Sequence, residues 1–371
     1  MPTRQLLPLE RHLLQSQLDV IRLGGAVSRD IANVLADARN ELAAAVERTS
    51  PDQLYSRSFQ TILSQQIDGA LLSYGEETRR RVLGEQEFVI EQEYRSATAA
   101  LLRDAGRLVP PVQPLLPVSR LAALASRPLG GQALSTWIDG HIGHLRQGIR
   151  RELGVSETLG EGSEAAARRL REAFGLSRNG ADVIARTALL SAAAEARDEV
   201  FKENSDLIVS YTWMATLDRR TCFRCGPLDG REEKNRTDFP PTPLHARCRC
   251  IIRADTRLAK EKRNQETLTR PAVREVEARK VQHRDGSTST SFRPILESVH
   301  QVSASVTFED FFASLPRDGR REYLGAWRFA QYEAGLLDLG DLKNRSDHSQ
   351  RTIPELRAII RRRGDAPAGV N

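Results

Sequence analysis

Apolar residues recur every three or four positions along most of the first 200 residues, which is the pattern of helices that bury one face. Residues 5–50 begin with such a run. The pair Gly24-Gly25 is expected to break it, so that a second helix covers residues 29–48. The pattern therefore predicts that the chain opens with consecutive helices.

Two further helical stretches follow on either side of a proline-rich segment. The first reaches about residue 103, with an interruption expected at Tyr74-Gly75. The second runs from residue 121 to about 153, with a break at Gly130-Gly131. Four prolines lie between positions 109 and 117, and proline disfavours helix both at its own position and at the one before it. This segment is expected to be an extended connection.

The middle of the chain combines helices with the clearest strand signal. Residues 163–174 and the alanine-rich residues 179–204 read as helices. Residues 207–217 are rich in β-branched and aromatic residues and read as a strand, and residues 250–253 form a shorter candidate. We expect these two strands to pair, and Trp213 to lie in the core against the alanine-rich helix.

The last third is more polar. Residues 256–291 are charged and end in a run of Gly, Ser and Thr, which predicts a helix that fades into a flexible linker. A compact helical module is expected at residues 307–361, and the remaining tail is expected to be disordered. The predicted organisation is a helical N-terminal region at 1–160, an α+β domain at 161–255, a charged linker at 256–300 and a helical module with a basic tail at 301–371.

Composition supports a mainly α fold with a small β element. Of the 371 residues, 40% are hydrophobic but only 5% are aromatic, so the core is built from Leu, Ala, Val and Ile. No run of about 20 apolar residues predicts a membrane span, and the first residues lack the apolar stretch of a secretory signal. The net charge is only +6, but all but six of the 55 basic residues are Arg, the residue that best fits phosphate groups.

All four cysteines of the chain and one histidine lie within a single segment, residues 221–250, which we call the cysteine window. Cys222 and Cys225 are two residues apart, as in a knuckle that directs two thiolates to one ion. His245 and Cys248 supply a second pair, and together the four residues match a closed, structural zinc site. Cys250 is a fifth candidate that could replace His245 or Cys248.

Other interpretations of the window are a reduced cluster without metal and a disulfide, for which the pairings Cys222–Cys225 and Cys248–Cys250 would be the most strained. A Cys/His catalytic pair is disfavoured because no third residue is placed to orient it. A nuclease would need a histidine general base and an open metal with oxygen ligands. Asp218, Asp229 and Asp238 are available as oxygen ligands, but no spare histidine lies nearby, since His245 is needed for zinc.

Several polar residues near the window have local roles as their simplest explanation. Asp218, with Thr221 capping it, suits a tight turn between the strand and the knuckle, and Asp229-Gly230 is a common turn dipeptide. His141 and His144 could share a helix face, but surface placement is the simpler interpretation.

The motif around the window resembles the phage Mu F-like head morphogenesis family, the minor head proteins of tailed bacteriophages. The resemblance covers about residues 165–255. It rests on residues 184–187, on Tyr211-x-Trp213, on residues 215–222 with Cys225 and Leu228-Asp229-Gly230, and on the closing Pro-Leu-His-x-x-Cys-Arg-Cys of residues 243–250. Phe223 and Arg224 occupy the positions between the knuckle cysteines where the family often has a proline. Parts of residues 308–356 are similar to a segment that often follows this domain.

This resemblance implies a few-copy structural component of the virion, located in the head interior, and in the host cytoplasm during assembly. It implies the portal protein as partner, with scaffold or major capsid protein as further candidates, and a role in head assembly, genome packaging or DNA ejection. It supplies no established active site, so an enzyme is not expected. Non-specific contacts to genomic DNA through Arg follow as a hypothesis, and no membrane partner is expected.

Overall fold

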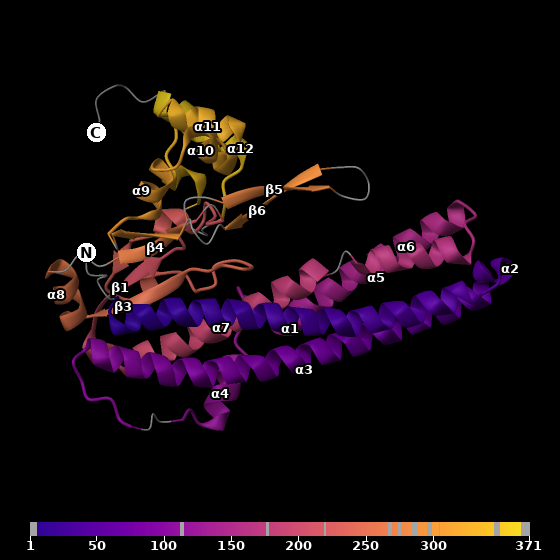
Figure 1. The fold of residues 1–371 in the computed structure, drawn as a ribbon, viewed down its shortest axis with the longest axis horizontal. Coiled ribbons are helices and arrows are strands. Elements are labelled where there is room, and N and C mark those ends of the chain that lie inside the picture. The colour runs from indigo at the N-terminus through magenta and orange to yellow at the C-terminus, as the bar shows by residue number, and fades with distance from the viewer. Residues whose placement is uncertain are drawn as a thin grey trace.

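The computed structural model describes residues 6–111, 115–175, 178–218, 220–265, 269–273, 276–282, 288–294, 299–303, 305–344 and 349–364. It contains an elongated helical bundle, a small sheet at one end of the bundle, and a helical C-terminal module beyond the sheet (Figure 1). The predicted fold class, mainly α with a small β element, is confirmed. Within the described ranges, no helix combines the length and the apolar character needed to cross a membrane.

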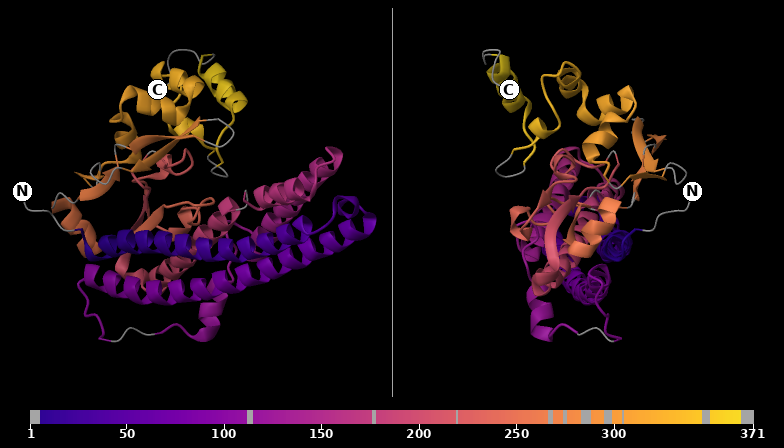
Figure 2. Two further views of the ribbon diagram at one scale, coloured as in Figure 1. Left: turned by 45° about the vertical axis from the view of Figure 1, so that its right-hand side comes forward. Right: turned by 90° about the vertical axis from the view of Figure 1, so that its left-hand side faces the viewer.

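Three long helices form the bundle. α1 (Pro8–Glu47) and α3 (Arg57–Asp104) run antiparallel along its whole length, and α7 (Arg178–Glu203) packs against both at the end near the sheet (Figures 1 and 2). The other helices of this part are α2 (Pro51–Leu54), α4 (Val118–Ala125), α5 (Leu134–Thr158) and α6 (Ser163–Gly175). The core is Leu, Ile, Val and Ala, as the composition predicts.

The breaks expected at Gly24-Gly25 and at Tyr74-Gly75 are wrong, because α1 and α3 continue through them. A Cβ added to Gly24 would lie 3.1 Å from the Cα atom of Arg186 on α7. A Cβ added to Gly75 would lie 2.6 Å from Cδ1 of Ile142 on α5. These glycines therefore permit close approach of two helices and do not end them.

The other expected interruptions are confirmed. Positions 109–111 and 115–117 form neither helix nor strand, while residues 112–114 lie outside the described part. Gly130 and Gly131 have positive φ angles of 57° and 87° and lie between α4 and α5. Only glycine adopts this backbone conformation at low cost, so here the pair does end a helical stretch.

The sheet has three antiparallel strands in the order β2-β1-β3: β1 (Ile208–Met214), β2 (Glu232–Glu233) and β3 (Ile251–Thr256). The expected pairing of the two predicted strands is confirmed, with Trp213 opposite Ile252. Trp213 is fully buried in the core that also contains the alanines of α7, and the ring centroid of Tyr211 lies 6.0 Å from that of Phe201 on α7.

The helix predicted at the start of the charged region 256–291 is confirmed as α8 (Arg257–Gln265). The flexible linker expected after it instead contains strands that the sequence analysis missed: β4 (Thr269–Val273), β5 (Val276–Gln282), β6 (Thr288–Pro294) and β7 (Val299–Ser303). β4 pairs with β7 and β5 pairs with β6, both antiparallel. Valine and threonine recur in these strands, and both residue types favour β structure. The many charged residues of the region obscured this strand signal in the sequence.

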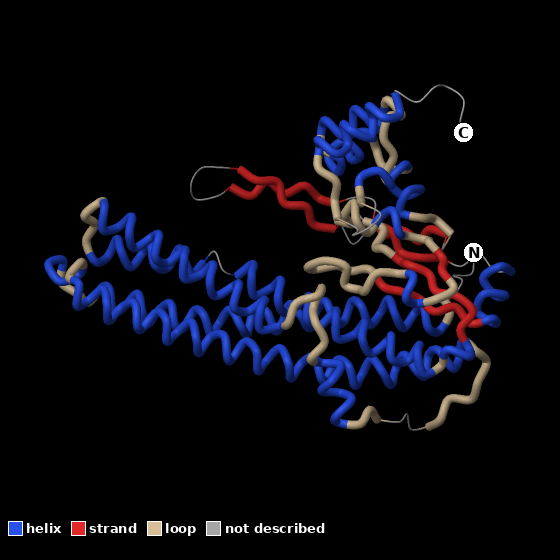
Figure 3. The backbone as a smooth tube through the Cα atoms, turned by 180° about the vertical axis from the view of Figure 1, so that it is seen from behind, coloured by secondary structure: helices blue, strands red, loops and turns tan. Residues whose placement is uncertain are grey.

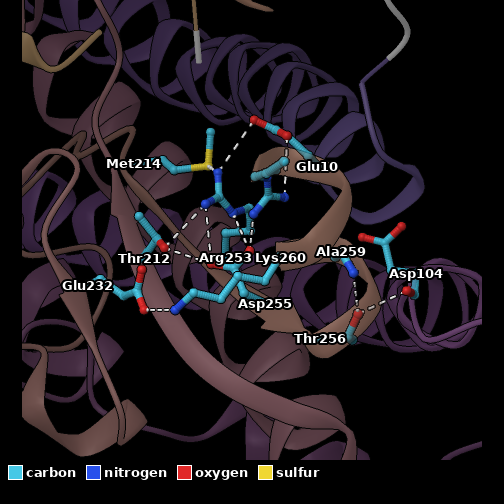
Figure 4. Close-up of polar contacts among 11 residues, drawn as sticks. Glu10, Asp104, Thr212, Met214, Glu232, Arg253, Asp255, Thr256, Ala259 and Lys260 are labelled. Carbon is cyan, nitrogen blue, oxygen red and sulfur yellow. Dashed lines mark hydrogen bonds and ion pairs between the residues drawn. The ribbon is translucent and has the colours of Figure 1, made fainter. Parts of the chain in front are cut away.

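A buried ionic network joins the sheet to the start of α1 (Figure 4). Nε of Arg253 on β3 donates to Asp255, at 2.9 Å, and Nη1 of Arg253 lies 3.6 Å from Glu10 of α1. Arg263 of α8 lies 3.5 Å from the other Glu10 oxygen and also pairs with Asp255. Thr212 on β1 donates a hydrogen bond of 2.8 Å to Asp255. Because Glu10 and Asp255 are buried and share the two arginines, losing either arginine would leave two buried carboxylates with a single cationic partner.

The C-terminal module consists of four helices: α9 (Phe308–Ala313), α10 (Arg317–Leu324), α11 (Ala326–Glu333) and α12 (Ile353–Gly364). Its core combines leucines with aromatic residues, among them Phe308, Phe311, Phe312 and Phe329. The predicted compact helical module is thus confirmed. α12 continues to Gly364, so the first residues of the predicted disordered tail are helical, while residues 365–371 lie outside the described part.

Candidate metal centre

The loop between β1 and β3 brings all five predicted ligands together. Cys222 and Cys225 lie in a tight turn after β1, in which the Cys225 backbone N–H donates to the Cys222 carbonyl at 3.1 Å. A second turn links His245 and Cys248 through a 3.0 Å backbone hydrogen bond. β3 begins directly after Cys250, so pairing of β1 with β3 carries both turns to the same end of the sheet (Figure 3).

The five ligand atoms form two overlapping groups, in each of which all atoms lie within 4.8 Å of one another. Nε2 of His245 lies 3.1 Å from Sγ of Cys222 and 3.2 Å from Sγ of Cys225. Sγ of Cys225 lies 3.7 Å from Sγ of Cys248, and Cys250 completes the second group. Cys225 belongs to both groups and is therefore the centre of the cluster.

These separations can be compared with a tetrahedral zinc site. With Zn–S of about 2.3 Å and Zn–N of about 2.0 Å, two sulfurs lie about 3.8 Å apart and a sulfur and a nitrogen about 3.5 Å apart. The Cys225–Cys248 separation of 3.7 Å matches, and the two sulfur–nitrogen separations of 3.1 and 3.2 Å are slightly shorter. The window is thus a Cys/His cluster that could bind a metal such as zinc.

His245 is oriented as a metal ligand requires. With the proton assigned to Nδ1, this nitrogen donates to the carbonyl of Ala246 at 2.8 Å, which leaves Nε2 facing the thiols. Burial lowers the pKa of His245, but hydrogen bonds with Cys222 and Cys248 outweigh burial and raise that pKa to about 10.

The pKa values of the cysteine thiols are shifted in different directions. A hydrogen bond with Cys225 lowers the pKa of Cys222 to about 4, His245 acts in the same direction and burial opposes both. Hydrogen bonds with Cys225 and Cys250 likewise lower the pKa of Cys248, whereas hydrogen bonds with its three neighbouring cysteines raise the pKa of Cys225. Thiolates are the ligand form of cysteine, and a bound cation would replace the shared protons.

None of the four cysteines forms a disulfide, which argues against the disulfide interpretation. Cys225, Cys248 and Cys250 are buried, while Cys222 and His245 are partly exposed. Packing as small hydrophobes does not by itself place a histidine nitrogen within hydrogen-bond distance of two sulfurs, and this donor set is one that could bind a metal such as zinc.

Asp218 and Thr221 form the expected turn before the knuckle. The Asp218 carboxylate accepts from the Arg220 backbone N–H at 2.9 Å, and the Thr221 hydroxyl donates to the Thr216 carbonyl. The sequence analysis missed the main partner of Asp218, which is Arg249, with Nη2 2.9 Å from Oδ1 and Nη1 bonded to Oδ2. The ion pair links the two halves of the window.

Asp229 and Gly230 also form the expected turn. Asp229 accepts a 2.7 Å hydrogen bond from the backbone N–H of Ala215, and Gly230 has a φ angle of 77°. The Gly230 N–H in turn donates to the Trp213 carbonyl at 2.9 Å, so this turn is held to β1.

Arg247, between His245 and Cys248, is a second residue that the sequence analysis missed. It has a φ angle of 58°, and its backbone N–H donates to the Thr187 hydroxyl at 3.1 Å. Its guanidinium lies 2.6 Å from Asp182 of α7. The positive φ has no sequence signal at an arginine, and these contacts fasten the second turn to the bundle.

The histidine pair of α5 lies elsewhere, beside a polar cavity of about 300 Å³. Nε2 of His141 lies 3.1 Å from the Tyr74 hydroxyl, and burial lowers the pKa of His141 to about 4. Among the described residues, groups of three or more potential metal ligands occur only in the cysteine window. The interpretation of these histidines as a surface pair is wrong for His141, which is partly buried between helices.

The fold and the cluster together define a helical protein with a Cys/His loop mounted on a small sheet. Residues 147–253 match the model of the family described as Phage Mu protein F like protein. The matched segment contains the whole cysteine window and implies a phage head morphogenesis protein. No curated protein and no solved structure matches the chain.

Proposed function

We propose that this chain is a minor head protein of a tailed bacteriophage that acts in head morphogenesis in association with the portal. The observation that carries the proposal is the family match over residues 147–253, which includes every ligand of the candidate metal centre. In this role the protein resides in the virion, in the head interior, after assembly in the host cytoplasm. The portal is the main partner, with scaffold or major capsid protein as further partners.

The shape of the bundle supports this role. α1 and α3 have 40 and 48 residues. At 1.5 Å per residue, α3 alone is about 70 Å long. A rigid rod of this length offers an extended surface to a ring-shaped partner such as a portal. The four-part division of the chain at residues 160, 255 and 300 is part of the same proposal, with the rod and the C-terminal module as surfaces for partners.

We further propose that the window binds one structural zinc ion through four of the five residues Cys222, Cys225, His245, Cys248 and Cys250. The ion would hold together a loop that has few apolar residues of its own between Asp229 and Thr242. A nuclease at this place is less well supported. Asp218 is bound to Arg249, Asp229 accepts from the Ala215 N–H, and Asp238 accepts from the Asn235 amide, so each carboxylate already has a structural partner.

Contacts with packaged DNA are the finer part of the proposal. They rest on the abundance of Arg, which contacts phosphate without reading sequence. Binding of this kind weakens steeply as salt rises, because it releases counterions. If the affinity for random-sequence DNA did not change between low and moderate salt, the proposed DNA contacts would be refuted, and the structural role would stand.

The decisive experiment combines elemental analysis of the purified protein with co-purification against the portal protein of the same phage. About one zinc per chain, as expected for a single closed site, with a stable portal complex supports the proposal as a whole. Portal binding without zinc supports the head role and refutes the metal. Zinc without portal binding, together with cleavage of plasmid DNA in magnesium, would favour the nuclease alternative.

A further inference from the structure

Phe223, between the two knuckle cysteines, contacts the C-terminal module. Its ring packs edge-to-face on Tyr323 of α10, with a centroid separation of 4.8 Å and an interplanar angle of 90°. The guanidinium of Arg328 on α11 lies 5.7 Å from the centre of the same ring. Aromatic pairs and cation–π contacts of this kind are attractive beyond the area that they bury.

The backbone on both sides of Phe223 belongs to the same contact. The Tyr323 hydroxyl donates a 2.6 Å hydrogen bond to the carbonyl of Thr221. Gly226 lies so close to Phe308 of α9 that an added Cβ would be 2.5 Å from the Phe308 ring. Leu217 is buried in the core of the module, among its leucines and phenylalanines. We call this surface, formed by Leu217, Thr221, Phe223 and Gly226, the knuckle seat.

The knuckle seat and the candidate metal centre therefore share one short stretch of chain. Cys222 and Cys225 alternate along it with residues that contact the module, and their sulfurs contact His245 and Cys248. Among its described residues, the stretch contains no helix or strand before the 3-10 turn at Gly226–Leu228. Its conformation thus depends on a few backbone hydrogen bonds of the turn, such as Cys225 N–H to the Cys222 carbonyl, and on side-chain contacts that include the ligand cluster.

The boundary next to the seat is open. A polar cavity of about 850 Å³ lies between the loop after the knuckle, at Pro227 and Arg231, and the module, at Lys343 and Arg351. Close packing between the loop and the module includes the aromatic contacts of Phe223 and Phe308 and the approach of Gly230 to Thr307. A change in the knuckle would act directly on the aromatic contacts.

We propose that metal binding by the cysteine window controls the docking of the C-terminal module, with Phe223 as the coupling residue. The inference rests on the proposed zinc site. An ion that fixes Cys222 and Cys225 also fixes the ring between them and the Thr221 carbonyl beside it, and so positions α10. Loss of the ion frees the knuckle, and the module loses its seat while the helical bundle stays folded. The module would then present its exposed basic residues, Arg361 and Arg362 of α12, in a different position.

Hydrogen exchange followed by mass spectrometry tests this coupling on the full chain. Exchange of α9 and α10 reports docking, and exchange of α1 and α3 reports the bundle. Zinc is measured in the same samples before and after treatment with a chelator. We expect chelation to speed exchange in α9 and α10 by about tenfold, because one aromatic contact and one cation–π contact are lost. Exchange in α1 and α3 should not change.

Phe223→Ala separates the seat from the metal. It should speed exchange in α9 and α10 as chelation does, yet keep the zinc content of the wild type, because no ligand is removed. Tyr323→Phe, which removes only the hydrogen bond to Thr221, should have a smaller effect in the same direction. Phe88→Ala is the matched control, since Phe88 is 55% exposed on α3.

The outcomes are distinct. Zinc binding with equal exchange of α9 and α10 before and after chelation would overturn the control of docking and leave the zinc site standing. A chain that binds no zinc, even when zinc is added, would overturn the zinc site and this inference together, while the portal experiment still decides the head role. Loss of zinc in Phe223→Ala would refute Phe223 as a coupling residue separate from the ligands.

Discussion

Arg249, which lies between Cys248 and Cys250, forms a two-point ion pair with Asp218, which lies four residues before Cys222. The pair joins the strand end that leads into the first turn to the segment that enters β3. Both side chains are largely shielded from solvent, with 22% of Arg249 and 12% of Asp218 exposed. The cysteine window is thus closed by an ion pair in addition to its ligand cluster.

Breaking this pair should destabilise the protein. Arg249→Ala leaves a largely buried carboxylate without its partner, which costs about 3 kcal/mol of unfolding free energy. Urea unfolding measures the change. The control is Arg22→Ala, because Arg22 pairs with Asp19 at a site where both side chains are more than half exposed. Such exposed pairs contribute about 0.5 kcal/mol. Equal effects of the two substitutions would show that the Asp218–Arg249 pair does not hold the window together.

Cys225 should be the most important ligand, because it belongs to both groups of the cluster. Cys225→Ser is expected to release the metal and lower the melting temperature by about 10 °C, since the energy of binding a structural ion is also folding energy. Cys222→Ser and Cys250→Ser each disturb only one group and should retain more metal. Zinc content and thermal melting are measured on the three variants in parallel. An unchanged melting curve and metal content in Cys225→Ser would refute a structural zinc site.

That the five candidate ligands lie close together was predictable from the sequence because the information is local. Cys222 and Cys225 fall within one turn, as do His245 and Cys248, and the two flanking strands are strong enough to read from residue types. The helical character of most of the chain was predictable for the same reason, since period and propensity are properties of neighbouring residues.

What the sequence did not reveal depends on distant partners. From sequence alone Gly24 is interpreted as a helix breaker, whereas in the structure it lets Arg186 pack closely against α1. Phe223 has no evident role between two cysteines until the structure shows that its ring packs on Tyr323. Arg249 likewise has an acidic partner 31 positions away, among many acidic residues. Local patterns cannot choose such partners, because the choice is made by tertiary packing.

The glycines of the long helices provide a direct test of close approach. Gly84→Ala in α3 should stabilise the protein by about 0.5–1 kcal/mol, because alanine favours helix and nothing lies within 4 Å of its Cβ position. Gly24→Ala makes the same change in α1 but brings Cβ to 3.0–3.1 Å from Cγ and Cα of Arg186. We expect no gain or a loss, so that the two variants differ by at least about 1 kcal/mol in unfolding free energy. An equal gain in both would mean that α1 and α7 do not meet at Gly24.

A buried carboxylate in the bundle should make stability sensitive to acid. Burial would raise the pKa of Glu93, but Arg197 and His12 outweigh burial and lower that pKa from 4.5 to about 2. Nε of Arg197 donates to Glu93 at 2.6 Å, and the pair joins α3 to α7. Since the folded-state pKa is depressed, the stabilisation is complete above pH 4.5 and is lost as the pH falls toward 2.

The measurement is urea unfolding of the wild type and of Glu93→Gln at pH 5 and pH 3. The wild type should lose about 2 kcal/mol more than Glu93→Gln over this interval, because glutamine has no proton to take up. Glu77→Gln is the control. The pKa of Glu77 is also lowered to about 2, by hydrogen bonds with Arg80 and Arg81, but its side chain is 27% exposed, against 4% for Glu93, so added salt should weaken its effect more than that of Glu93. If the wild type and Glu93→Gln lost the same unfolding free energy between pH 5 and pH 3, Glu93 would be excluded as the acid-sensitive link between α3 and α7.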